Sequence, residues 1–245
     1  MKYRISNLFA FTVMIVMNAL ANALPINGKT TGELSDQYPN LFVPAGITFS
    51  IWGVIYLLLL TVMAVQFFAR YRDQMSSLGW TVTANFMLNG LWIVVWHYEK
   101  VVPSLIVMVA LLATLVSINK TLKGKDGWLL RLAFGIYLGW ICIATIANTT
   151  ALLVTMSWDG FGVSQPTWTI IMILIGAGVG AGTMIRLQNP FLALAVVWGF
   201  YGIVLKRQLD YSLIAMFSYA GMIIVMAAVV YLIYNSRFNQ VEKNT

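Results

Sequence analysis

The sequence predicts an all-α membrane protein, a polytopic helical bundle of about eight transmembrane helices. Three observations predict this fold class: 60% of the 245 residues are apolar, only 9% are charged, and the apolar residues form long runs. Soluble domains contain roughly 45–50% apolar and about 25% charged residues. The composition therefore excludes an ordinary cytosolic enzyme, a disordered protein and a nucleic-acid binder. We expect the protein to be embedded in the lipid bilayer.

Eight apolar runs have about the length that a membrane-spanning helix needs, roughly 20 residues. Turn-forming residues separate them, for example Asn189 and Pro190 before the seventh run. The fifth run is long, so we expect a helix that is tilted or extends past the bilayer. The seventh is short, and a re-entrant segment is the alternative there. In chain order the expected helices cover residues 8–24, 44–68, 78–96, 101–118, 129–156, 168–185, 190–205 and 211–234.

The first run has two interpretations. Its basic start, its apolar stretch and the sequence Ala21-Asn22-Ala23 also resemble a signal peptide with an A-x-A cleavage site. We expect the segment to be retained as a helix. Cleavage would leave the other seven helices in the same orientation.

The basic residues predict that both termini are cytoplasmic, because cytoplasmic loops are enriched in Lys and Arg. Of the 15 basic residues, eleven then lie inside and four outside. We expect a multi-pass protein of a bacterial-type plasma membrane. The inner set is Lys2, Arg4, Arg70, Arg72, Lys120, Lys123, Lys125, Arg131, Arg186, Arg237 and Lys243, and the outer set is Lys29, Lys100, Lys206 and Arg207.

The longest loop, residues 25–43, is expected on the outer face. Loops longer than about 12–15 residues without structure of their own are often lids or binding loops. A lid over a site and a solvated connector are the two interpretations of this segment.

None of the expected helical cores contains Asp, Glu, Lys or His. Ion- and proton-coupled transporters use such groups as relays, so a proton-coupled antiporter is not expected. Cys142 and His97 are the only residues of their types, which excludes an internal disulfide and a Cys- or His-based metal site. We expect no catalytic residue and no metal ligand.

Polar and aromatic residues instead recur at helical spacing in three of the runs, so each set shares one helix face. An Asn in hydrocarbon is costly unless it is hydrogen-bonded, so these faces point at protein or at a cavity. Packing between helices is one interpretation, and an aromatic-lined intramembrane pocket is the other. The three sets are Thr48, Phe49, Trp52 and Tyr56; Asn85, Asn89, Trp92 and Trp96; and Tyr137, Trp140, Ala144 and Asn148.

The same residues carry a resemblance to a known family. Pro44, Trp52 and Tyr56 follow the spacing Pro-x7-Trp-x3-Tyr, residues 88–92 match LNxxW, and residues 137–148 match YLxWxxxATxxN. In these blocks the chain resembles the TspO/MBR family, the tryptophan-rich sensory proteins that include the mitochondrial translocator protein. The resemblance covers about residues 5–157.

The resemblance implies a five-helix bundle whose first loop folds over a pocket for porphyrins, other tetrapyrroles or sterol-like lipids. The loop motif of the family is KPxWxPP, and residues 38–44 lack its Lys, its Trp and the first Pro of its final pair. We expect Phe42 to substitute for the missing Trp. Porphyrin propionates would find few bases at the mouth of this pocket. The residues expected to bind the ligand, from spacing and resemblance together, are Phe42, Pro44, Phe49, Trp52, Tyr56, Asn85, Asn89, Trp92, Tyr137, Trp140, Ala144 and Asn148.

Two domains are expected: a TspO-like bundle over residues 1–157 and a three-helix membrane extension over residues 158–245. Residues 176–182 contain two overlapping GxxxG spacings, Gly176/Gly180 and Gly178/Gly182. Small residues let helices approach closely in lipid. Packing within the chain and a homodimer through this helix are both open.

The function expected from these observations is binding, as a sensor or carrier of a tetrapyrrole-like or lipidic molecule, with no enzymatic activity and no cofactor other than a tetrapyrrole held as ligand. A facilitative transporter or permease subunit for a small hydrophobic solute is the alternative. A third interpretation is degradation of a bound porphyrin by photochemistry centred on Trp52, Trp92 and Trp140.

Overall fold

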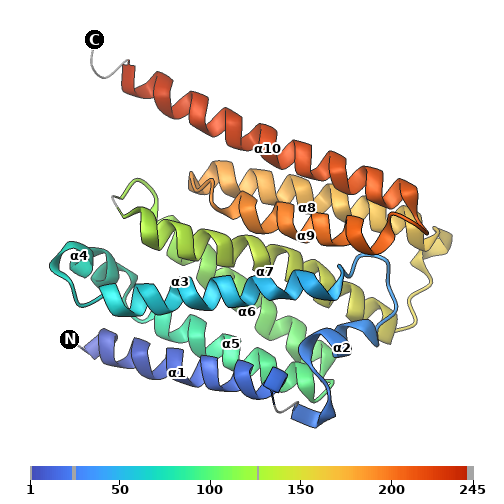
Figure 1. Cartoon of the computed structure of the whole chain (residues 1–245), viewed down its shortest axis with the longest axis horizontal. Helices are drawn as coiled ribbons and strands as arrows, with labels where there is room; N and C mark the ends of the chain where they lie inside the picture. Colours follow the sequence, from blue (N-terminus) through green and yellow to red (C-terminus); the bar gives the residue numbers. More distant parts are fainter. Residues whose placement is uncertain (1, 24–25, 126, 242–245) are drawn as a thin grey trace.

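The computed structural model describes residues 2–23, 26–125 and 127–241, and in these residues all regular structure is helical (Figure 1). The helices are α1 (Lys2–Ala23), η1 (Ile26–Gly28), α2 (Thr31–Asp36), η2 (Gly46–Ser50), α3 (Ile51–Val65), α4 (Ala69–Leu78), α5 (Thr81–His97), α6 (Val101–Leu122), α7 (Trp128–Thr155), η3 (Gly160–Gly162), α8 (Gln165–Leu187), α9 (Leu192–Arg207) and α10 (Ser212–Val241). The long helices run back and forth between two ends, named here the α2 end and the α4 end. The first helix begins and the last ends at the α4 end.

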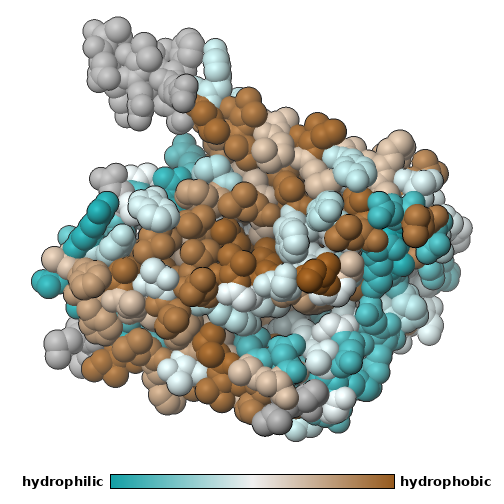
Figure 2. Space-filling model, in the orientation of Figure 1, coloured by the Kyte–Doolittle hydropathy of each residue, from teal (hydrophilic) through white to brown (hydrophobic). Residues whose placement is uncertain are grey.

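The chain is an integral, multi-pass membrane protein. Among the described residues, 6 helices are long and apolar enough to cross a membrane, or 7 if α4 and α5, bent by 68°, form one span. Helix α9, the expected seventh span, has 16 residues and is about 24 Å long, less than the roughly 30 Å of a hydrocarbon core. The count of eight spans therefore stays a prediction. Figure 2 shows apolar residues over the middle of one face and polar residues toward both ends.

Helix α7 is the centre of the bundle, with α6 and α3 on one side and α8 and α9 on the other. In an apolar stretch of 18 residues of α7, 72% of the residues are buried, against 33–39% in the corresponding stretches of the other spans. Glycine permits its approach to α9, since a Cβ at Gly139 would collide with the carbonyl oxygen of Leu192. Helix α1 packs along α5, and α8, α9 and α10 pack on one another.

A polar contact fixes the α4 end, where the chain passes from α8 to α9. The amide nitrogen of Asn189 donates to Asn119 Oδ1 and to the carbonyl of Arg131, both at 2.8 Å. The Asn119 amide donates to the Phe134 carbonyl at 3.0 Å. Buried amides that are satisfied in this way tie α6, α7 and the start of α9 together.

Most of the basic residues that predict the cytoplasmic side lie on or beside α4, α6 and the start of α7, at the α4 end. Lys243 lies outside the described residues, as do Leu24 and Pro25 at the end of the first expected helix and the start of the loop. Which end faces the cytoplasm stays a prediction, and so does the division of the chain at residue 157.

The GxxxG helix α8 has two different faces. A Cβ at Gly176 would meet Ile146 and Phe200, and one at Gly180 would meet Val196, so these glycines pack within the chain. At Gly178 and Gly182 a Cβ would meet nothing within 4 Å. A homodimer through residues 176–182 stays a prediction for that open face.

Candidate functional site: an aromatic cavity beneath the α2 segment

Residues 26–43, named here the α2 segment, fold over the bundle instead of forming an open connector (Figure 1). A capping box begins α2: Glu33 N donates to Thr30 Oγ1 at 3.3 Å, and Thr30 N donates to Glu33 Oε2 at 2.7 Å. The backbone hydrogen bond from Thr30 lowers the pKa of the Glu33 carboxyl below its usual value. Lys29 pairs with Glu99 at 3.1 Å, which fastens the segment to the end of α5.

The buried face of α2 covers a small aromatic cavity between α3, α5 and α7. Its volume is about 40 Å³, room for a few water molecules and far below the roughly 300–1,000 Å³ of a ligand pocket. Tyr38 closes the cavity further by packing on Trp96, with ring centroids 5.5 Å apart. The lining residues are Thr31, Ser35, Pro44, Phe49, Trp52, Trp92, Trp96, Trp140, Ile143, Ala144, Ala147 and Asn148.

A second cavity of about 460 Å³ lies beside the first, between α1 and α3. Thr31, Phe49 and Trp52 line both cavities, so their side chains form the partition between them. Trp52 stacks on Tyr56, with ring centroids 5.4 Å apart and an interplanar angle of 19°. The other lining residues are Ile15, Asn18, Ala19, Asn22, Gly32, Ser50, Gly53 and Tyr56.

Three tryptophans that line the aromatic cavity carry a buried indole N–H without a hydrogen-bond partner. They are Trp92, Trp96 and Trp140, whose side chains are 6%, 5% and 2% exposed. The Oγ1 atom of Thr31, on the same cavity, is also buried without a partner. An indole N–H is a donor only, and each such group left unpaired costs about 1–3 kcal/mol. A molecule that offers acceptors to these donors would recover part of that cost.

Seven of the twelve residues expected to bind the ligand line this cavity, and Tyr56 lines the neighbouring one. Phe42 is buried and lines a third cavity, at the ends of α7 and α8. Trp96 was expected on the polar stripe of residues 85–96 but not as a ligand contact. The seven residues are Pro44, Phe49, Trp52, Trp92, Trp140, Ala144 and Asn148.

Asn89, Tyr137 and Asn85 hold helices together and do not line the cavity. Asn18 Nδ2 donates to Asn89 Oδ1 at 2.8 Å, and Asn89 Nδ2 donates to the Tyr137 hydroxyl at 2.6 Å. This chain joins α1, α5 and α7. Asn85 Nδ2 donates to Thr114 on α6 at 2.9 Å. For these three residues the structure favours the packing interpretation.

Asn148 does both. Its Nδ2 donates to Ser104 Oγ at 3.0 Å, which bonds α7 to α6, and its side chain also lines the cavity. Thr31, Ser35, Ile143 and Ala147 were not expected at the site. The sequence held a signal for two of them, because Ile143 and Ala147 follow Trp140 and Ala144 by three residues on the same helix face.

Comparison with protein families matches residues 4–231 to the family described as TSPO-like protein. The match includes α8, α9 and most of α10 as well as the helices around the aromatic cavity. Comparisons with curated proteins and with solved structures found no match. Because the family match covers nearly the whole chain, this protein belongs to the TSPO-like family.

Proposed function

We propose that this protein binds a flat, largely apolar molecule with hydrogen-bond acceptors, a tetrapyrrole or a lipidic compound, and senses or carries it without changing it chemically. The observation that carries the proposal is the group of buried, unpaired indole N–H donors of Trp92, Trp96 and Trp140 on one cavity. Aromatic walls contact a flat apolar body, and fixed donors orient it.

The cavities imply that the ligand opens its own site. At about 40 Å³ the aromatic cavity is too small for a tetrapyrrole, and the neighbouring cavity measures about 460 Å³. Rotation of the partition residues Phe49 and Trp52 would join the two. The proposed site is therefore the space from Tyr56 to Trp140, with the α2 segment as its lid.

The charges at the lid favour neutral acceptors over carboxylates. Lys29 is paired with Glu99, and Lys206 is paired with Asp36 at 2.5 Å. A ligand carboxylate would have to compete with these acids for the bases. We expect the dimethyl ester of protoporphyrin IX to bind at least as tightly as the free diacid.

The test uses the full chain purified in detergent, with quenching of tryptophan fluorescence by the two porphyrins and with a sterol added as a competitor. Trp140→Phe keeps an aromatic ring and removes one donor, so affinity should fall about fivefold, or roughly 1 kcal/mol. Trp128→Phe is the matched control, because Trp128 is 59% exposed and lies outside the cavity. Equal affinities for wild type and Trp140→Phe would contradict the proposal.

Two further measurements separate the other functions. A carrier or sensor should return the porphyrin with an unchanged absorbance spectrum after illumination, whereas photochemical degradation would bleach it. A facilitative transporter would move the solute into sealed vesicles, and a sensor would bind it without net flux. We propose a bacterial-type plasma membrane as the location, which fractionation of the source cells would test.

A further inference from the structure

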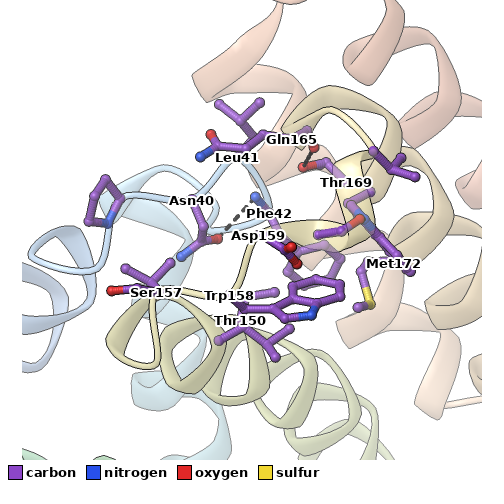
Figure 3. Close-up of a pocket in the computed structure, with 16 residues that line it drawn as sticks. Asn40, Leu41, Phe42, Thr150, Ser157, Trp158, Asp159, Gln165, Thr169 and Met172 are labelled. Carbon is purple, nitrogen blue, oxygen red and sulfur yellow. Dashed lines mark hydrogen bonds between the residues drawn. The ribbon is translucent and has the colours of Figure 1, made fainter.

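A third cavity, of about 380 Å³, lies at the α2 end and shares no lining residue with the aromatic cavity. It is open to the surface and is lined by the loop before η2, the end of α7, the η3 turn and the start of α8 (Figure 3). Its volume lies within the range of small-molecule sites, roughly 300–1,000 Å³. The inference drawn from it does not depend on the proposed function.

Asp159 is the single charged residue among those that line this third cavity. Its Oδ1 accepts a hydrogen bond from Phe161 N at 2.9 Å, which fixes the carboxylate at the start of η3. Among the described residues, Asp159 forms no ion pair; Arg207 binds the carbonyls of Asn40 and Leu41 instead. The cavity therefore has one fixed negative charge and no base.

Aromatic rings stand next to this carboxylate. The centroid of the Trp158 ring lies 4.9 Å from the ring centroid of Trp168 and 5.5 Å from the ring centroid of Phe161. Trp168 is held in place, because its Nε1 donates to the Gly160 carbonyl at 2.8 Å. In Figure 3, Trp158 and Asp159 lie between the loop that carries Asn40 and the helix that carries Met172. The rings thus offer a preformed aromatic surface beside a charge.

We propose that this cavity binds an alkylammonium cation. Quaternary and alkylated ammonium groups bind where an aromatic face and a carboxylate meet, and they are weakly hydrated, so little is lost when water is displaced. The cation would lie between the Asp159 carboxylate and the Trp158 ring. Its apolar part would contact Leu153, Val154 and Met172, which also line the cavity.

The test is equilibrium dialysis of radiolabelled choline with the full chain in dodecyl maltoside. We expect saturable binding, against which dimethylbutanol, the neutral carbon isostere of choline, does not compete. Asp159→Asn removes the charge and still accepts the hydrogen bond from Phe161 N, so the turn is kept. An exposed ion pair contributes only a small part of the binding free energy. Loss of the pair between Asp159 and choline should therefore weaken choline binding by about threefold to fivefold.

Asp210→Asn is the control, because Asp210 is an exposed acid near the same end of the bundle and does not line the cavity. Trp158→Leu should also weaken choline binding, while porphyrin quenching at the aromatic cavity is retained. Absence of saturable binding, full competition by dimethylbutanol, or equal weakening by Asp210→Asn would overturn the proposal.

The alkylammonium group could belong to a free solute or to a lipid headgroup. Nanodiscs of phosphatidylcholine and of phosphatidylglycerol distinguish the two sources. Weaker binding of free choline in phosphatidylcholine would support a headgroup as occupant. Equal binding in both would support a soluble alkylammonium compound.

Discussion

The indole Nε1 of Trp198 on α9 donates a hydrogen bond of 2.8 Å to the carbonyl oxygen of Thr48 in η2. The backbone N–H of Ala45 donates to the Gly202 carbonyl at 3.0 Å, again between the η2 region and α9. Arg207, at the end of α9, binds two carbonyls of the α2 segment. The C-terminal helices therefore hold the segment that covers the aromatic cavity.

Removing the indole donor tests this attachment. Trp198→Phe removes the hydrogen bond from α9 and leaves the Thr48 carbonyl only a local backbone partner, the N–H of Ile51, which should destabilise the protein by about 1 kcal/mol. The loss should be local, so hydrogen exchange should accelerate at residues 45–50 more than in α6. Trp128→Phe, at an exposed indole, serves as the control. An unchanged rate of hydrogen exchange at residues 45–50 would mean that the bond from Trp198 does not hold η2 against α9.

Contact between α9 and η2 also depends on the absence of a side chain at Gly202. A Cβ there would collide with Thr48 Oγ1 and lie 2.8 Å from Pro44 Cβ. Gly202→Ala should therefore destabilise the protein by roughly 1–3 kcal/mol, seen as a lower midpoint of thermal unfolding. Gly182→Ala is the matched control, since a Cβ there meets nothing within 4 Å. Similar midpoints for the two variants would refute the proposed tight contact.

The sequence predicted the parts of this arrangement but not their contacts. Apolar runs located the long helices, because burial in lipid needs an unbroken apolar stretch. Most ends were placed within a few residues, but the starts of α1 and α3 and the end of α10 were missed by six or seven residues. Helix α4 was missed, since ARYRDQMSSL is polar and carries no such run. The attachment of α9 to η2 could not be predicted, because it depends on glycines whose role appears only where two backbones meet.

The aromatic cavity, too, was predicted only in part from the sequence. Spacing placed Trp52, Trp92 and Trp140 each on the polar and aromatic face of its own helix, since residues three or four apart share a helix face. The family resemblance, taken together with the spacing, predicted that the three faces meet at one site. Trp96 was expected on the same helix face as Trp92 but not as a ligand contact, and the structure places it on the cavity beneath the α2 segment. The helix α2 had a visible signal, the Thr30-x-x-Glu33 capping box, that the loop interpretation did not use.

We expect the capping box to make the stability of the α2 segment depend on pH. The pKa of the Glu33 carboxyl is lower in the folded protein than in the unfolded chain. The ionised carboxylate therefore stabilises the fold fully above its pKa in the unfolded chain, and this stabilisation is lost as the pH falls through its pKa in the folded protein. Proteolysis within α2 should therefore become faster in acid. Glu33→Gln can still accept from Thr30 N, and its cleavage rate should not depend on pH. Parallel pH profiles for both proteins would assign the effect to another group.

Asn89 tests the difference between packing and ligand contact. Asn89→Ala removes the partner of both Asn18 and Tyr137, whose polar groups are buried. Stability should fall by about 1–3 kcal/mol, while ligand affinity of the folded fraction is unchanged because Asn89 does not line the cavity. Thr61→Ala, at an exposed hydroxyl bonded within its own helix, is the control. A loss of affinity at full stability would place Asn89 in the site.

The orientation of the bundle is tested with cysteines read by an impermeant thiol reagent in intact cells. Gly32→Cys and Ser157→Cys lie at the α2 end and should be labelled if that end is outside. Lys120→Cys, exposed at the end of α6, should be labelled only after the cells are opened. The native Cys142 is buried, so it adds little background. The basic residues concentrated at the α4 end predict this result because that end should be retained in the cytoplasm. Labelling of Lys120→Cys from outside would reverse the orientation, and with it the side from which the α2 segment admits a ligand.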